Sequence, residues 1–318
     1  MKLPCRLCPH HCRLDPGQTG ICGARVNRDG AVVDAFYGLI SAAAMDPIEK
    51  KPLYHFFPGS QILSLGFYGC SFHCPFCQNH AIARGKPREG ARKLSPADAV
   101  TLARDNGSFG IAYTYSEPTV HHEYLMDTAR EARAAGLKNV LISNGFLNPE
   151  PARMLLALTD AANIDLKGFT EEFYRRELKG SLEPVKEFIR MAAAMTHLEV
   201  TTLVIPGRND SPEEIEAMAR FLSTLSRDIP YHLSAYHPSY RYTAPPTDPG
   251  TLLGLVEVAR RHLNYVYTGN IAGGDSSTYC PACGALLVER RGYGAVMRGI
   301  NQNRCTECGK STSVINHP

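Results

Sequence analysis

The sequence has 318 residues, of which 44% are hydrophobic and 20% charged, and its formal net charge is +3. This length suffices for one large domain with appendages or for two ordinary domains, and the composition excludes a largely disordered chain. No run of eighteen apolar residues occurs, and the N-terminus lacks the apolar stretch of a signal peptide. We therefore expect a cytoplasmic protein without a membrane span.

The most informative part of the composition is the eleven cysteines. A disulfide framework is typical of short secreted chains with an even number of cysteines, whereas this chain is long and has no export signal. We therefore predict metal ligands. Three groups contain four, three and four cysteines: Cys5, Cys8, Cys12 and Cys22; Cys70, Cys74 and Cys77; Cys280, Cys283, Cys305 and Cys308.

The first group belongs to a predicted N-terminal cysteine-rich module, residues 1–50. Its spacing is irregular, and His10 and His11 lie among the cysteines. These donors suit a structural zinc ion or an auxiliary iron–sulfur cluster, which could relay electrons or bind substrate. Between these alternatives we favour a metal-stabilised structural cap.

Residues 51–275 alternate between strand and helix patterns at intervals of about 30 residues, which is typical of repeated βαβ units. This predicts an α/β fold with a partial or complete (β/α) barrel. The predicted strands are 63–68, 111–115, 139–143, 163–166, 198–205, 231–235 and 265–268. The predicted helices are 96–105, 121–135, 149–158, 183–195, 212–225 and 249–262.

The second cysteine group follows the first of these strands, as Cys70-x3-Cys74-x2-Cys77. Three thiolates can hold three irons of a [4Fe–4S] cluster and leave the fourth iron open to another molecule. A zinc site with His73 or His80 as fourth ligand is the alternative, and three unligated buried cysteines are another. The position at the end of a barrel strand favours the cluster.

The third group forms two Cys-x2-Cys-Gly knuckles in a predicted C-terminal module, residues 276–318. The interval between the knuckles, 21 residues, is close to that of the four-cysteine zinc-ribbon template. Zinc and a redox-active, rubredoxin-type iron both fit this donor set.

The central triplet, with Phe76 before its last cysteine, resembles the signature of the radical S-adenosylmethionine (SAM) superfamily. Cys77-Gln78-Asn79, Asp165–Gly168 and Val204–Gly207 resemble the pyruvate formate-lyase-activating-enzyme branch. Within that branch, Lys51–Asn79 and the cysteine-rich ends are most similar to the AmmeMemoRadiSam system radical SAM enzyme.

The resemblance implies that SAM chelates the open iron of a [4Fe–4S] cluster. It also implies that one electron cleaves SAM to a 5′-deoxyadenosyl radical, which abstracts hydrogen from a substrate. The electron would come from a low-potential donor of the ferredoxin or flavodoxin type.

The resemblance further implies a set of SAM-binding residues. Glu117 would accept a hydrogen bond from the SAM ammonium, with Ser116 in place of a glycine of the family pattern. Lys167 would reach the SAM carboxylate, and Asp165 would lie beside it or beside a monovalent cation. The remaining implied contacts to SAM are Phe76, Asn79, Ser143, Asn144, Ile205 and His237.

The substrate is not evident from these residues, and a small molecule and a protein are both compatible. A glycyl-radical-enzyme activase is the alternative, but Ile142 stands where that branch commonly has aspartate, and two extra metal modules are present. A non-enzymatic alternative is a zinc-ribbon protein that binds nucleic acid. A net charge of +3 without a stripe of lysine and arginine argues against nucleic-acid binding.

Overall fold

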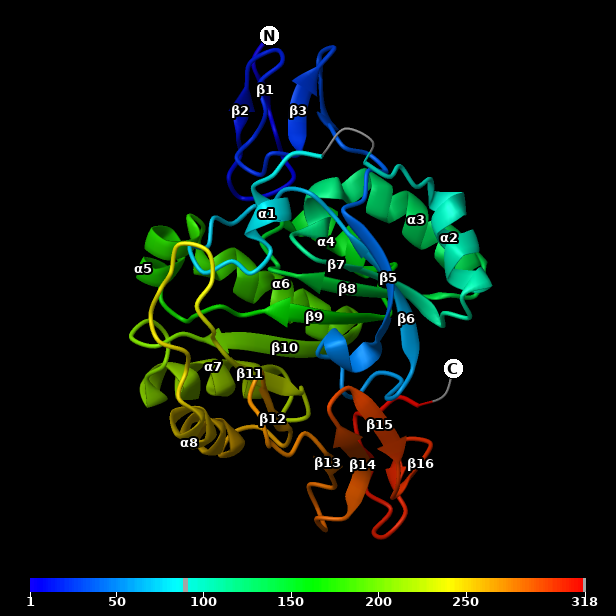
Figure 1. Cartoon of the computed structure of the whole chain (residues 1–318), viewed down its shortest axis with the longest axis vertical. Coiled ribbons are helices and arrows are strands. Elements are labelled where there is room, and N and C mark those ends of the chain that lie inside the picture. Colours follow the sequence, from blue (N-terminus) through cyan, green and yellow to red (C-terminus); the bar gives the residue numbers. More distant parts are fainter. Residues whose placement is uncertain (88–90, 317–318) are drawn as a thin grey trace.

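The computed structural model describes residues 1–87 and 91–316 and is built around one curved sheet (Figure 1). The strand order is β12-β11-β10-β9-β8-β7-β6-β5; neighbours from β6 to β12 are parallel, and β5 is antiparallel to β6. Because β5 and β12 are the two edges, the barrel is partial. The bounds are β5 Ala42–Pro47, β6 Gln61–Gly66, β7 Gly110–Thr114, β8 Lys138–Ser143, β9 Ala161–Asp165, β10 His197–Val204, β11 Tyr231–Ala235 and β12 Val266–Gly269.

All seven predicted strands are present, with ends shifted by at most two residues. The sequence pattern missed β5, because Ala42-Ala43-Ala44 lacks the β-branched and aromatic residues that mark strands. This strand forms through its pairing with β6, which runs from Ala42–Gly66 to Pro47–Gln61.

Helices cover the outer face of the sheet, and the six predicted ones are confirmed (Figure 1). Ser95 and Ser211 cap α2 and α7, but only Ser95 forms a full capping box. The Glu214 carboxylate instead accepts the backbone N–H of Phe169 at 2.6 Å. The bounds are α1 His80–Ala83, α2 Pro96–Asp105, α3 His122–Ala134, α4 Pro149–Leu156, α5 Glu171–Phe173, α6 Leu182–Met195, α7 Pro212–Leu225 and α8 Pro249–Arg260, with 3-10 turns η1 Ile48–Lys50 and η2 Pro118–His121 and a π-turn η3 Tyr174–Leu178.

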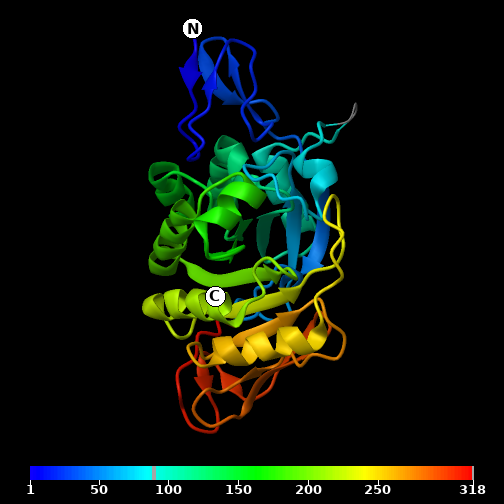
Figure 2. The same cartoon turned by 90° about the vertical axis from the view of Figure 1, so that its left-hand side faces the viewer.

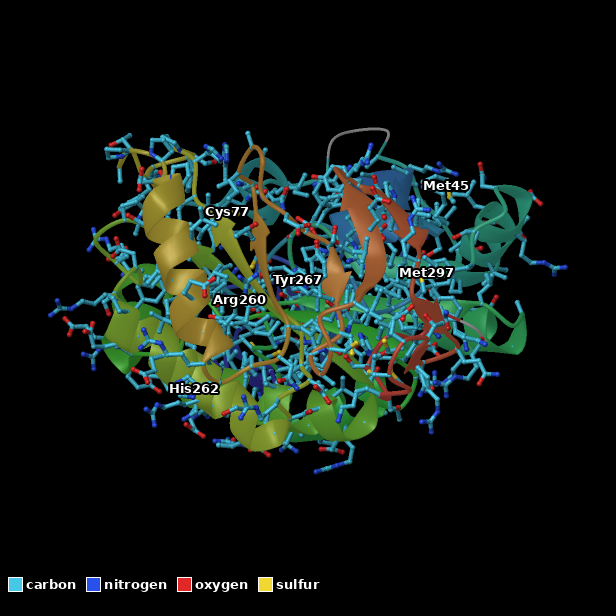
Figure 3. All side chains as sticks on the ribbon, turned by 90° about the horizontal axis from the view of Figure 1, so that it is seen from below. Met45, Cys77, Arg260, His262, Tyr267 and Met297 are labelled. Carbon is cyan, nitrogen blue, oxygen red and sulfur yellow. The ribbon has the colours of Figure 1, made fainter. Side chains whose placement is uncertain are left out.

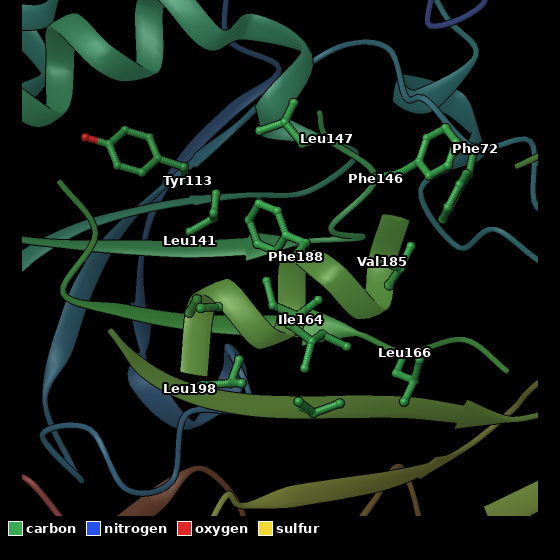
Figure 4. Packing of buried hydrophobic residues seen from close by; sticks show 14 of the residues in the cluster. Phe72, Tyr113, Leu141, Phe146, Leu147, Ile164, Leu166, Val185, Phe188 and Leu198 are labelled. Carbon is green, nitrogen blue, oxygen red and sulfur yellow. The ribbon is translucent and has the colours of Figure 1, made fainter. Parts of the chain in front are cut away.

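The main core lies between the sheet and these helices. Leu141 and Ile164 from the sheet meet Phe188 of α6, and the packing continues through Phe146 to Phe72 (Figure 4). Phe72 and Phe146 have ring centroids 4.9 Å apart. This aromatic contact joins the loop that carries the central cysteines to the rigid core.

A second apolar cluster fills the inside of the barrel at the N-terminal ends of its strands. Ile48, Leu53 and Phe56 from the β5–β6 connection pack on inward-facing residues of the sheet, including Ala112 and Val140. Strand residues alternate between faces, so the inward positions further along the same strands face the opposite end of the barrel. This plug leaves the C-terminal end as the open end.

Two small modules lie at the two ends of the molecule in Figure 1, and Figure 2 shows the same arrangement from the side. The N-terminal module holds hairpins β1–β2 and β3–β4, and the C-terminal module holds a three-stranded sheet and hairpin β16–β17. Residues 317 and 318 of the predicted C-terminal module lie outside the described residues. The bounds are β1 Leu3–Pro4, β2 Arg13–Leu14, β3 Arg25–Arg28, β4 Ala31–Asp34, β13 Thr278–Tyr279, β14 Leu286–Arg291, β15 Gly294–Met297, β16 Ile300–Asn301 and β17 Arg304–Cys305.

The C-terminal module packs against the plugged end of the barrel. Tyr267 of β12 donates or accepts a 2.8 Å hydrogen bond with Thr278 of β13, and in the view from below it lies between α8 and the module (Figure 3). Ser313 binds His55 of the β5–β6 connection at 2.7 Å. None of the helices in the described part of the chain combines the length and apolar character that a membrane crossing needs.

Candidate active site and metal centres

The three central cysteines lie on the loop between β6 and α1, at the open end of the barrel. All three are partly buried free thiols. The loop is held from two sides, because His73 donates its backbone N–H to Leu178 of the π-turn at 2.9 Å and Arg84 donates to the carbonyl of Cys70 at 2.7 Å. The chain therefore presents three sulfurs from one well-anchored loop.

The chemistry of these donors fits an iron–sulfur cluster better than a single zinc ion. The His73 ring is exposed and contacts Ile21, and the His80 ring stacks on Tyr240 with centroids 4.5 Å apart. Among the described residues, only the C-terminal cysteines bring three or more ligand atoms within 4.8 Å of one another. The central thiols are therefore spaced more widely than the ligands of one ion, as ligands of a multi-iron cluster must be.

Burial raises the pKa of all three thiols, and that of Cys74 reaches about 11 although Lys167 opposes the shift. The free thiols are thus protonated at neutral pH. Metal binding must displace these protons, because the thiolate is the ligand.

A cavity of about 280 Å³ adjoins the three thiols inside the barrel. Its wall combines predicted and unpredicted residues. Predicted residues in the wall are Phe76, Asn79, Ser116, Glu117, Asn144, Asp165 and Lys167. Pro52, Thr201, Leu203 and Ser234 also line it, as does Asn270, which the sequence places after the last strand at the same end of the barrel.

Glu117 forms a fixed carboxylate in this wall. It is fully buried and accepts hydrogen bonds from the Ser143 hydroxyl at 2.7 Å and the Asn144 backbone at 2.8 Å. Burial raises the pKa of Glu117, while these donors and Thr119 oppose the shift. Among the residues that the structure describes, Oε2 accepts the Asn144 bond alone, and a carboxylate oxygen has about two acceptor sites, so one remains for a ligand donor.

Asp165 is the last residue of β9, and Lys167 lies two positions further along the chain, so the two side chains lie on the same face. Their side chains form an ion pair with Nζ and Oδ2 2.9 Å apart. Burial alone would lower the pKa of Lys167, but Asp165 and the thiol of Cys74 outweigh it and raise the pKa. Lys167 therefore keeps a positive charge beside the cysteines.

Three predicted SAM contacts do not line this cavity. Ser143 is turned to Glu117, Ile205 is fully buried in the main core, and the exposed His237 binds the Asn270 carbonyl at 3.1 Å. Ile142 faces inward and packs against the apolar plug. Its apolar side chain suits that plug, which explains why the aspartate of the activating-enzyme branch is absent.

Thr201 and Ser234 were not predicted as site residues, because the sequences of their strands are typical of buried core strands. Thr201 lies on β10, where inward residues alternate with outward ones, and its hydroxyl donates to Asn163 at 2.9 Å. Asn163 in turn donates to the Pro52 carbonyl at 2.7 Å. These hydrogen-bonded residues separate the cavity from the apolar plug. In the sequence, a polar residue at every second position of β10 could have indicated this polar layer.

A second cavity, of about 520 Å³, borders the same cysteines on the outer side of their loop. Its rim carries Arg84, Arg176, Lys179 and Arg241, against the single carboxylate of Glu177. This cationic rim offsets negative charge at a thiolate centre and admits small anions from solvent.

The C-terminal cysteines form a compact site for one ion. Cys280 and Cys308 have sulfurs 3.6 Å apart, and those of Cys283 and Cys305 are 3.7 Å apart. Metal–sulfur bonds of about 2.3 Å in a tetrahedron separate sulfurs by about 3.8 Å. Burial would raise the pKa of Cys280, but backbone amides and Cys308 lower it to about 7, which favours a thiolate ligand.

Replacing Cys283 by alanine is expected to lower the melting temperature and leave the chemistry of the central cysteines intact below it. The site lies beyond the plug, at the other end of the barrel from the central cysteines, so an ion bound there would stabilise the module. Metal analysis and thermal melting measure this effect. Lost activity at an unchanged melting temperature would instead indicate a redox-active iron.

The N-terminal cysteines gather without reaching this compactness. Cys5 and Cys22 are buried, and Cys8 and Cys12 are partly buried. Burial and, to a lesser extent, the charges of the other three cysteines raise the pKa of Cys8 to about 12, with a backbone hydrogen bond opposing. The four thiols therefore lie close enough to interact electrostatically. In the described part of the chain, however, no three of their sulfurs lie within 4.8 Å of one another, as ligands of a single ion would.

Comparison with known proteins identifies the family. The radical SAM superfamily model matches residues 65–222. An uncharacterised protein of Methanocaldococcus jannaschii is 40% identical and spans 99% of this chain and 96% of its own. The pyruvate formate-lyase-activating enzyme of Listeria monocytogenes is 23% identical over 52% of this chain and 72% of its own length. The isethionate sulfite-lyase activating enzyme of Oleidesulfovibrio alaskensis is 28% identical over 44% of this chain and 45% of its own length.

Solved structures share the fold. Streptococcus suis SuiB bound to the precursor peptide SuiA superposes with a TM-score of 0.55 at 15% identity, over 71% of this chain and 52% of that one. A radical SAM methyltransferase from Sphaerobacter thermophilus gives 0.53 at 19% identity, over 73% and 71%. The triplet at the open end of a partial barrel, the family match and the activating-enzyme relatives lead to one conclusion: the chain is an enzyme of the radical SAM superfamily.

Proposed function

We propose that this enzyme binds SAM in the cavity beside Cys70, Cys74 and Cys77 and cleaves it reductively. The observation that carries the proposal is the convergence of three free thiols, a fixed carboxylate and a partly buried lysine on one cavity. A [4Fe–4S] cluster held by the three thiolates would supply the electron that splits SAM into methionine and a 5′-deoxyadenosyl radical, which takes hydrogen from the substrate.

The chain's own residues position SAM in this proposal. The free acceptor site of Glu117 receives the ammonium group, and Lys167 binds the carboxylate while Asp165 holds the lysine in place. Phe76 offers an apolar wall for the adenine.

A glycyl-radical-enzyme activase is the second candidate, because several relatives carry the name activating enzyme. These relatives align over 37% to 52% of this chain, whereas the relative that spans 99% of it is uncharacterised. Formation of a glycyl radical on a partner protein, observed by electron paramagnetic resonance (EPR), would support this activity.

The proposal is tested by anaerobic reconstitution with iron and sulfide. The expected product is brown and, after reduction by dithionite, gives the EPR signal of a reduced [4Fe–4S] cluster that changes when SAM is added. It should also produce 5′-deoxyadenosine. A colourless protein that contains only zinc would overturn the proposal.

Replacing Lys167 by methionine is expected to weaken SAM binding about 10- to 150-fold, since a hydrogen bond to a charged group contributes about 1.5–3 kcal/mol. Equilibrium binding of SAM to the reconstituted protein measures this. Lys138→Met is the control, because Lys138 pairs with Asp160 at the closed end of β8. Equal affinities in the two variants would remove Lys167 from the SAM site.

A further inference from the structure

The N-terminal cysteine module touches the central cysteine loop through its cysteines. The backbone N–H of Cys70 donates a hydrogen bond to the carbonyl of Cys22 at 3.0 Å. Gly69 makes this approach possible, because a Cβ at this position would lie 2.5 Å from the Cys22 oxygen. Its φ of +85° is also a conformation that glycine adopts without strain. One hydrogen bond therefore connects a ligand candidate of each centre.

Two partly buried polar contacts fix the module in this position. Arg25 of β3 binds Glu123 of α3, with Nη2 and Oε1 2.7 Å apart. His10 binds the carbonyl of Ser71 in the central loop at 2.8 Å. The two cysteine groups are thus held together by side chains and backbone on both sides of the Cys22–Cys70 contact.

The donor spacing distinguishes the two terminal modules. In the same molecule, the C-terminal thiols draw together to the separation that one tetrahedral ion needs. Neither the N-terminal four nor the central three have three sulfurs within 4.8 Å, within the residues that the structure describes. Ligands of a cluster are separated by the irons between them, so the N-terminal group, like the central one, lacks the compact arrangement of ligands of a single ion and leaves room for a cluster.

We propose that Cys5, Cys8, Cys12 and Cys22 hold a second iron–sulfur cluster, which passes electrons through Cys22 and Cys70 to the central cluster. This replaces the structural cap that the spacing alone favours. The electron relay rests on the proposed function, because its acceptor is the proposed central cluster. The presence of the second cluster does not depend on that function. Each transfer moves one electron: a reduced ferredoxin- or flavodoxin-type protein is oxidised, the central cluster is reduced, and no covalent bond changes.

The second cluster is tested by removing the central one. The variant Cys70→Ala/Cys74→Ala/Cys77→Ala, reconstituted anaerobically, should retain the Mössbauer signal of a [4Fe–4S] cluster and about half of the roughly eight cluster irons expected in the wild type. Adding Cys8→Ser/Cys12→Ser should abolish that signal. Zinc at the N-terminal cysteines and no cluster iron in the triple variant would overturn the proposal, whatever the state of the central site.

The relay is tested with two reductants. Dithionite is a small anion, and the cationic rim of the outer cavity should attract it to the central loop, whereas a protein donor is far larger than this cavity of about 520 Å³. The variant Cys8→Ser/Cys12→Ser should therefore produce 5′-deoxyadenosine at the wild-type rate with dithionite and severalfold more slowly with reduced flavodoxin. Equal rates with flavodoxin in variant and wild type would overturn the relay.

A matched glycine pair tests the contact itself. Gly69→Ala forces the Cys22 carbonyl away, whereas Gly23→Ala introduces a side chain at a similar φ of +77° with nothing within 4 Å. Gly69→Ala should keep both clusters by iron count and slow only the flavodoxin-driven reaction severalfold relative to Gly23→Ala. Equal rates of reduction of the central cluster in the two variants would show that electrons do not pass through this contact. If Gly69→Ala loses a cluster, the relay is judged from the flavodoxin-driven rate of Cys8→Ser/Cys12→Ser instead.

Discussion

Replacing Cys74 by alanine is expected to abolish formation of 5′-deoxyadenosine from SAM in the presence of dithionite. Cys70 and Cys77 alone would leave two irons of the proposed cluster without a protein ligand. His73 and His80 are both engaged elsewhere, by Ile21 and Tyr240 respectively, so neither is placed to substitute. Chromatography of the reaction products, together with the iron content of the variant, measures the effect.

Cys283→Ala is the matched control, since it removes a thiol of the same chemistry at the opposite end of the barrel. Assayed below its melting temperature, it should produce 5′-deoxyadenosine. Production at the wild-type level by Cys74→Ala would remove the central triplet from the reaction.

Replacing Glu199 by alanine is expected to destabilise the protein by about 3–5 kcal/mol, the usual cost of breaking a buried ion pair. Glu199 is fully buried on β10 and accepts from the backbone of Tyr54 at 3.0 Å and of His55 at 2.7 Å. It also binds His197 at 3.1 Å and His232 at 2.7 Å. Removal of the carboxylate leaves several donors unsatisfied between the barrel and the segment on which the C-terminal module packs.

Urea unfolding of the metal-loaded protein measures this loss. Glu199→Gln keeps one acceptor oxygen and the side-chain volume, so it should recover part of the stability. Glu257→Ala is the surface control, because its ion pair with Arg260 is exposed. A loss no larger than that of Glu257→Ala would show that the buried network does not stabilise the fold.

The same network makes stability depend on pH. Burial lowers the pKa of His55 well below 6.5. Burial would raise the pKa of Glu199, but His197 and His232 outweigh it and hold the pKa far below 4.5. In both cases the unfolded chain binds more protons as the pH falls, so stability should decline below pH 6.5 through His55 and further below 4.5 through Glu199. A urea midpoint that does not change between pH 7 and pH 5 would contradict the contribution of His55.

Much of the fold follows from local patterns. The strand at Tyr231–Ala235, which begins with an aromatic residue, and the helix at Pro212–Leu225, which follows a Ser-Pro start, both have the expected bounds. β5 and the π-turn Tyr174–Leu178 have no such signal, because pairing with β6 and packing beneath the cysteine loop decide them.

Sequence spacing by itself determined the three cysteine groups, the order of the barrel elements and the place of the central triplet after a strand. Ligands within one loop are close in sequence, so their chemistry is visible in the chain. Tertiary structure alone decided which distant residues meet: Ser143 with Glu117 rather than with a ligand, and Cys22 with Cys70 across the module boundary. Such contacts depend on how the strands and modules are arranged relative to one another in the folded chain. The local periodicity of the sequence contains no information on that arrangement.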